Sequence, residues 1–114
     1  MEHRLVIQRK YLEQIRTRQK IIEGRVWDKT IVNFQCNDII IFHSHDDPPL
    51  LVRCRIIALP RYDNFHDMLQ LGGYKNYLPD AETLEEAIAV YHGFPSYCER
   101  ARRHGVVAIY LKLE

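Results

Sequence analysis

The sequence predicts an α+β fold, in which helices are inserted into a small β-barrel-like sheet. Segments with strand character lie at both ends and in the middle of the chain. Helical segments fall between them, but not in the strict strand–helix alternation that is typical of a parallel sheet. A chain of 114 residues, 46% of them hydrophobic, is large enough for one core. We therefore expect a single domain over residues 1–114.

The first part of the chain predicts three strands and one helix. Tyr11, Leu12 and Ile15 recur at helical spacing, which indicates a helix over residues 8–17. An almost continuous apolar run at 38–43 indicates a strand buried on both faces. The strands expected here lie at 3–7, 20–27 and 38–43, with a connector over 28–37 that contains a short strand near 30–34.

A hairpin and a group of helices follow. Residues 44–49 have turn composition, and residues 50–59 alternate apolar and polar side chains, so the two strands around this turn should pair. Asn64 can cap a helix that ends at Gly72. Two further helices have capping-box spacing, with Thr83 before Glu86 and Ser96 before Glu99. Residues 106–113 then alternate as a last strand.

The predicted strand at 20–27 carries three charges inside an apolar run. Glu23 and Arg25 share one face, because side chains alternate along a strand. Lys20 falls on the other face of an ideal strand, and it joins the pair only if it lies in the turn before the strand. Charges in a buried strand are either paired or used in function. We therefore place the candidate functional site here.

Net charge, cysteine content and targeting segments indicate which partners and which cellular compartment to expect. A net charge of +1 means that any nucleic-acid surface must be a local patch. Cys36, Cys54 and Cys98 lack zinc-site spacing and are odd in number, which favours a reducing compartment. We find no signal peptide or membrane span. We expect an intracellular, cytoplasmic protein with no cofactor, and a monomer by default.

Four segments together resemble the ASCH domain family over about residues 3–113. Residues 20–25 match its K-x-x-E-x-R motif, residues 38–42 its D-x-I-x-F strand, residues 62–69 its Y-x-x-F-x-x-M-L segment, and residues 105–109 its closing strand. Arg18 and Asn37 stand where the family has glycine. The resemblance implies a PUA-like barrel of five to six strands with a cleft along the Lys/Glu/Arg strand.

The resemblance also implies a function. The family is thought to bind RNA or nucleotides, and it is associated with RNA metabolism and transcription coactivation. One branch is similar to N4-acetylcytidine amidohydrolases, which use a Lys, a Thr and a Glu. Lys20 matches the first of these residues, Glu23 occupies the position of the Thr, and Asp80 is the nearest match to the Glu.

The site residues have both functional and structural interpretations. In a ligand site, Lys20 would contact phosphate or act as a base. Glu23 would accept a hydrogen bond from a base edge, or position water as the catalytic carboxylate partner of Lys20. Arg25 would bind phosphate or hold Glu23. In a structural role, the three would form only an ion-pair network. Further candidates for nucleic-acid contact or stacking are Arg61, Tyr62, Tyr97 and Arg100.

Two other groups have alternative interpretations. Asp80 is either a loop residue before a helix or a second catalytic carboxylate facing Lys20. His43, His45, Asp46 and Asp47 resemble a metal cluster, but a hairpin turn is expected to be polar, so we predict no metal site.

We therefore carry two main hypotheses. The first is an ASCH domain that binds RNA or a modified nucleotide in the cleft, and the alternative is a small hydrolase, an amidohydrolase on a modified nucleoside or a ribonuclease, that uses the same cleft. A closed cleft with Lys20 buried beside a carboxylate favours the hydrolase. An open basic groove that continues onto Arg53, Arg55 or Arg100 favours RNA binding. A module that binds another protein without chemistry is a third hypothesis.

Overall fold

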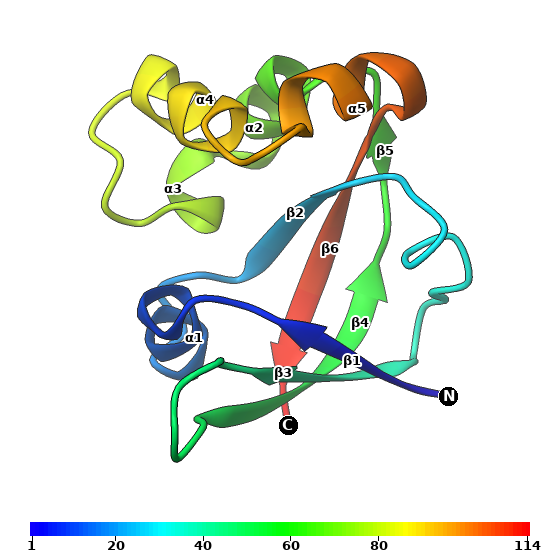
Figure 1. Ribbon diagram of the computed structural model, residues 1–114, viewed down its shortest axis with the longest axis vertical. Coiled ribbons are helices and arrows are strands. Elements are labelled where there is room, and N and C mark those ends of the chain that lie inside the picture. The colour runs from blue at the N-terminus through cyan, green and yellow to red at the C-terminus, as the bar shows by residue number, and fades with distance from the viewer.

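One curled sheet and five helices make up the computed structural model, which describes all of residues 1–114 (Figure 1). The sheet contains six strands: β1 (Glu2–Val6), β2 (Ile22–Val26), β3 (Ile39–His43), β4 (Leu51–Ala58), β5 (Arg61–Tyr62) and β6 (Val106–Leu113). The helices are α1 (Arg9–Arg16), α2 (Phe65–Gly72), α3 (Tyr74–Tyr77), α4 (Leu84–His92) and α5 (Tyr97–His104). The α+β class and the barrel-like sheet predicted from the sequence are confirmed. None of the helices combines the length and the apolar character that crossing a membrane requires.

The sheet is a half-barrel with two unpaired edges. Its order is β1-β3-β4-β6-β2, and β5 pairs with β6 beyond the end of β4. The β1–β3 pair is parallel, and the other pairs are antiparallel. The edge strands are therefore β1 and β2, which the curl of the sheet turns toward each other. Unpaired edges expose backbone donors and acceptors that other groups must satisfy.

Two hydrophobic cores lie on opposite faces of β6. Val107, Ile109 and Leu111 face the interior of the half-barrel, whereas Val106 and Ala108 face helices α2 to α5. These helices gather over one end of the sheet, while α1 lies apart from them, near β1 (Figure 1). Because β6 is buried on both faces, its side chains are apolar at successive positions, as expected for a central strand.

The hairpin of β3 and β4 forms as predicted. Ile40 pairs with Cys54 and Phe42 with Val52, and all four side chains are buried in the half-barrel. The alternation predicted for β4 is present: Val52 and Cys54 are buried, whereas Arg53 between them is exposed. The strand ends at an irregularity between Ile56 and Ala58, shortly before Pro60 removes a backbone donor.

Several local predictions were wrong. Residues 30–34 form no strand: residues 29–33 are turns, because Asp28 accepts hydrogen bonds from the backbone of Thr30 and Ile31. Ser96 does not cap α5 with its side chain, since its backbone is left-handed with φ 66°. Helix α3 and strand β5 were not predicted, because elements of four and two residues are too short to show a hydrophobic periodicity.

The turn between α1 and β2 decides where Lys20 lies. Strand β2 begins only at Ile22, so Lys20 is in the turn and not on the strand. Arg18 adopts φ 67° and Asn37 adopts φ 75°, so both have a left-handed backbone at the two positions where the resemblance implies glycine. A left-handed backbone is unfavourable for an arginine, while asparagine tolerates it.

We predict that Arg18→Gly stabilises the protein by about 1 kcal/mol, because glycine adopts positive φ without the steric penalty of a Cβ. Asn37→Gly is the matched control, and it should stabilise the protein clearly less, because asparagine tolerates a left-handed backbone. Thermal unfolding of the two variants beside the wild type measures both effects. A fall in the unfolding midpoint of Arg18→Gly would contradict the prediction.

Candidate functional site

Lys20 is buried at the inner end of a cleft between the two sheet edges. Its side chain is 1% exposed. The ammonium donates to the backbone oxygens of Ile22 and Tyr77, both at 2.8 Å, and its Nζ lies 3.0 Å from Oε1 of Glu23. These three acceptors match the three N–H groups of an ammonium. Burial lowers the pKa of Lys20, and the nearby Glu23 carboxylate offsets part of this effect.

Glu23 lies between two cations. Its Oε1 faces Lys20, and its Oε2 accepts a hydrogen bond of 2.6 Å from Nε of Arg25. The carboxylate is 9% exposed. Burial alone would raise its pKa, but the positive charges of Lys20 and Arg25 outweigh burial and hold the pKa of Glu23 below its ordinary value. Glu23 is therefore a fixed carboxylate anion.

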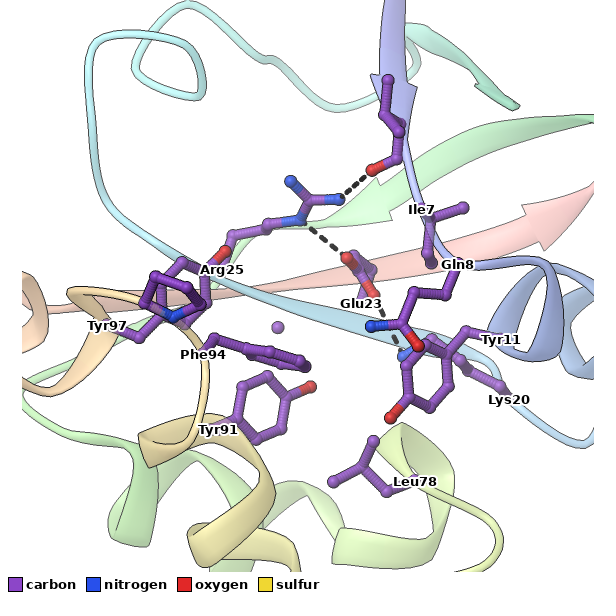
Figure 2. Close-up of a pocket in the computed structure, with 13 residues that line it drawn as sticks. Ile7, Gln8, Tyr11, Lys20, Glu23, Arg25, Leu78, Tyr91, Phe94 and Tyr97 are labelled. Atoms are coloured by element: carbon purple, nitrogen blue, oxygen red, sulfur yellow. Dashed lines mark hydrogen bonds and ion pairs between the residues drawn. The ribbon is translucent and has the colours of Figure 1, made fainter. Parts of the chain in front are cut away.

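Arg25 connects the two unpaired edges of the sheet. It belongs to β2, yet its Nη2 donates to the backbone oxygen of Val6, at the end of β1, at 3.0 Å (Figure 2). Its Nη1 makes no hydrogen bond within the protein, and its side chain is 21% exposed. The guanidinium thus satisfies an edge acceptor and keeps a free donor group.

A cavity of about 230 Å³ opens beside this cluster of Lys20, Glu23 and Arg25, which we call the charged triad. Figure 2 shows side chains from β1, α1 and β2 on one side and from the α4–α5 region on the other. The lining residues beside the triad include Ile7, Gln8, Tyr11, Leu78, Tyr91, Phe94 and Tyr97. The cavity, which we call the cleft, therefore has a charged floor and largely aromatic walls.

The aromatic wall is held by ring contacts. Tyr91 and Tyr97 each stack on Phe65, with centroid distances of 4.7 and 5.8 Å. Phe94 meets both tyrosines edge to face, at 5.9 and 5.5 Å. Contacts of this kind favour a defined ring geometry beyond simple burial. The wall is therefore ordered before any ligand arrives.

Gly24 allows this wall to approach the strand. A Cβ at this position would lie 2.6 Å from Cε of Met68 and 2.8 Å from the hydroxyl oxygen of Tyr91. Both distances are shorter than van der Waals contact. Gly24 is the variable position between the Glu and the Arg of the K-x-x-E-x-R motif, and here it lets Tyr91 line the cleft next to Glu23.

Asp80 does not join the charged triad. Its Oδ2 accepts a hydrogen bond of 3.0 Å from Nε2 of Gln14 and pairs with Lys10 at 3.4 Å. It borders a separate cavity of about 320 Å³ that shares Tyr11 and Leu78 with the cleft. Asp80 itself does not line the cleft. A role of Asp80 as a catalytic carboxylate stays a prediction.

The other predicted contact residues are distributed between the cleft and its surroundings. Tyr97 lines the cleft, and Arg100 lies 5.7 Å from its ring centroid while pairing with Asp28 at 2.6 Å. Arg61 lies over the ring of Trp27, with 4.1 Å from Cζ to the centroid. Tyr62 is half-buried on β5 beside Arg61, away from the cleft.

The sequence analysis missed Gln8, Tyr11, Tyr91 and Phe94 as lining residues. A signal existed for the last two, because Tyr91, Phe94 and Tyr97 recur every three residues across the Gly93–Pro95 break. Helical spacing predicts an apolar face for Tyr11 with Leu12 and Ile15, and likewise for Tyr91 with Leu84, Ala87 and Ile88. Both tyrosines do contact the cores, and each also turns part of its ring toward the cleft.

The polar side chains of the turn between β3 and β4 make hydrogen bonds to other residues of the protein. Asp46 accepts hydrogen bonds from Arg9 and from Ser44. No three side chains of His, Cys, Asp or Glu gather anywhere in the chain in a way that could hold a metal ion.

Comparisons with known proteins agree with this geometry. A family model described as the ASCH domain matches residues 5–114. The crystal structure of hypothetical protein PH0355 is similar with a TM-score of 0.88 and 32% identity, covering 100% of both chains. The solution structure of protein PF0455 from Pyrococcus furiosus has a TM-score of 0.80 and 34% identity, covering 99% of this chain and 97% of that one. A search of the curated proteins finds no match.

A more distant structure shows the same fold. The ASCH protein from Zymomonas mobilis has a TM-score of 0.67 and 12% identity, covering 97% of this chain and 66% of that chain. Fold and cleft together define a PUA-like half-barrel with a Lys/Glu/Arg triad between its edges. The chain belongs to the ASCH domain family.

We predict that Glu23→Gln lowers the free energy of unfolding by about 3 kcal/mol at pH 7, because it leaves the buried Lys20 and the partly buried Arg25 without their counter-charge. The folded pKa of Glu23 lies below its ordinary value of 4.5. Its contribution is therefore present above pH 4.5 and is lost as the pH falls through the folded pKa. The stability difference between wild type and variant should shrink as the pH falls below 4.5.

Glu13→Gln is the matched control for this measurement. Glu13 pairs with Arg9 and Arg16 on the surface, where ion pairs contribute little. Denaturant unfolding at several pH values from 7 to 3 would measure both variants. Equal effects of the two substitutions would contradict the assignment of Glu23 as the counter-charge of the triad.

We also predict that Gly24→Ala destabilises the protein by about 2 kcal/mol, because the added methyl group overlaps Met68 and Tyr91. Gly93→Ala is the control, since a Cβ there meets only backbone oxygens at 3.3 and 3.4 Å. Thermal unfolding of both variants checks the difference. A Gly24→Ala protein as stable as the wild type would show that the wall moves freely.

Proposed function

We propose that this ASCH domain binds RNA or a nucleotide by taking one nucleobase into the cleft. The observation that carries the proposal is a fixed carboxylate and a guanidinium with a free donor on the floor of a cavity with aromatic walls. Recognition of RNA commonly combines hydrogen bonds to a base edge with stacking on aromatic rings. Both parts of such a site are present in the cleft.

The floor offers complementary hydrogen-bonding groups. Each oxygen of Glu23 accepts one contact from the protein, and a carboxylate oxygen can accept a second. Nη1 of Arg25 remains free to donate. A base edge that presents an N–H group next to an acceptor would satisfy both residues at once. This arrangement supports base recognition rather than phosphate binding on the floor.

Lys20 supports the floor and does not face the ligand. Its ammonium group is surrounded by two backbone oxygens and Glu23. We therefore assign it the role of positioning Glu23. The contact with phosphate expected from the sequence is instead assigned to residues outside the cleft, where Arg61 and Tyr62 line the adjoining surface.

A second candidate function is hydrolysis of a modified nucleoside or of RNA. One observation favours it: Lys20 is buried beside a carboxylate, and its burial lowers the pKa of its amine even though the Glu23 carboxylate offsets part of this effect. Against it, the ammonium would have to release a proton that its three acceptors now hold in place. The proposal of a binding site therefore fits the geometry better than a Lys20 base.

The basic surface that the sequence analysis tied to RNA binding is only partly available. Arg53 pairs with Glu2, Arg55 with Glu114, and Arg100 with Asp28. These arginines are thus already matched by carboxylates. Any further contact with an RNA backbone requires other cations.

Tyr97→Leu tests the binding proposal, because it removes a stacking ring but keeps an apolar side chain. Stacking of a base on an aromatic ring contributes about 1–3 kcal/mol, so the affinity for nucleoside monophosphates should fall at least fivefold. Tyr74→Leu is the matched control, since Tyr74 is half-buried and bonds Glu82 outside the cleft. Titration calorimetry with the four nucleoside 5′-monophosphates measures the affinities.

Turnover of N4-acetylcytidine by the same samples tests the alternative. Product formation that is lost in Lys20→Met, in a variant that still folds, would favour the hydrolase. Equal affinities of Tyr97→Leu and Tyr74→Leu for every nucleotide would contradict a base in the cleft.

A further inference from the structure

An open groove of about 500 Å³ lies beyond the cleft, where β5 meets the C-terminal end of α5. Two segments that are about forty residues apart in the sequence form it. Its lining is almost entirely polar, with Arg61, Tyr62, Asp63, Arg102, Arg103 and His104 as its main residues. We call it the arginine groove.

The groove concentrates positive charge in a nearly neutral protein. The chain as a whole has a formal net charge of +1. Within the groove, three guanidinium groups stand against one carboxylate, that of Asp63. Arg103 pairs with Glu99 at 2.9 Å, whereas Arg102 has no carboxylate partner and contacts only Sγ of Cys98 at 3.9 Å. The groove therefore attracts anions.

Arg61 is held in place for such a contact. Its guanidinium lies over the ring of Trp27, and its Nη2 donates to the backbone oxygen of His104 at 3.2 Å. No carboxylate pairs with it, so its remaining N–H groups are free. A guanidinium fixed by stacking loses little conformational freedom on binding an anion, and its fork of donors suits phosphate oxygens.

The groove and the cleft share one helix. Tyr97 at the start of α5 lines the cleft, and residues 102–104 at its end line the groove. Five to seven residues of helix span roughly 8–10 Å. Two or three nucleotides stacked at about 3.4 Å each cover the same distance. One strand can therefore reach both places.

We propose that the arginine groove binds the phosphate backbone of a single-stranded nucleic acid whose base occupies the cleft. The inference rests on the proposed function and extends it from one nucleotide to a strand of several. The groove contacts phosphates and carries no base specificity, whereas the cleft contacts one base. A free mononucleotide in the cleft is too short to reach the groove.

The test compares two double variants that each remove two guanidinium groups. Arg102→Gln with Arg103→Gln changes the groove, and Arg53→Gln with Arg55→Gln is the control on β4. Fluorescence anisotropy with a labelled random hexaribonucleotide, and with its deoxyribose counterpart, measures the affinity at several salt concentrations. Calorimetry with the four nucleoside 5′-monophosphates measures the cleft alone.

We expect the groove variant to bind the hexaribonucleotide roughly five- to tenfold more weakly at 50 mM salt, with the slope of log affinity against log salt reduced by about 0.7 to 1.4. Its affinity for mononucleotides should equal that of the wild type. Asp63→Asn removes the carboxylate of the groove and should tighten hexanucleotide binding about twofold. An equal loss of affinity for the deoxyribose hexanucleotide would identify phosphate, rather than the 2′-hydroxyl, as the recognised group.

Each outcome separates the groove from the cleft. If the groove variant binds the hexanucleotide as the wild type does while Tyr97→Leu binds it more weakly, the groove does not bind phosphate. The proposed function of the cleft is then unaffected. If the groove variant binds more weakly while Tyr97→Leu has no effect, the groove binds phosphate. The proposal that the same strand places a base in the cleft is then wrong. Unfolding midpoints of all variants close to that of the wild type exclude loss of folding as the cause.

Discussion

The ion pairs around Glu23 are the interaction on which this structure depends. The half-barrel ends in two strands that do not pair with each other, and Arg25 spans the gap by donating to the backbone of β1. Glu23 balances the charge of the partly buried Arg25, and Glu23 in turn is balanced by Lys20. A buried charge without such partners would be strongly unfavourable. The opening of the barrel and the location of the cleft both follow from this arrangement.

A buried ion triad is not the most stable way to fill this gap. Replacing buried ion pairs by well-packed apolar side chains is often neutral or stabilising, so their presence indicates a role beyond stability. Here Lys20 has no free donor, which fixes the orientation of the Glu23 carboxylate. A ligand therefore meets an acceptor that needs no rearrangement, and preorganisation of this kind lowers the entropic cost of binding. The stacked rings of Tyr91 and Tyr97 do the same for the wall.

Helix α5 connects the two candidate binding surfaces. Its first turn contributes an aromatic ring to the cleft, and its last turn contributes cations to the arginine groove. Basic residues at a helix C-terminus also complement the helix dipole, so their position alone does not establish a ligand site. The difference lies in Arg61, which comes from β5 and is fixed beside them by Trp27. Two distant segments thus place unpaired guanidinium groups on one surface.

The sequence by itself determined the α+β class, the β3–β4 hairpin and the capped starts of α2 and α4. These features depend on residues close together in the chain: alternating burial in β4, and the side chains of Asn64 and Thr83, which accept backbone hydrogen bonds at the two helix starts. The family motif also identified the three charged residues. Strand periodicity could not decide on which face Lys20 lies, because that depends on the left-handed turn at Arg18.

Only the tertiary structure decided which groups meet. Asp80 has the chemistry of a catalytic partner, but the packing of α1 places it beside Gln14 and Lys10. The aromatic wall and the arginine groove both join segments that are far apart in the sequence. Local patterns report the preferences of neighbouring residues, whereas contacts across the fold depend on how the sheet curls and where its edges remain open.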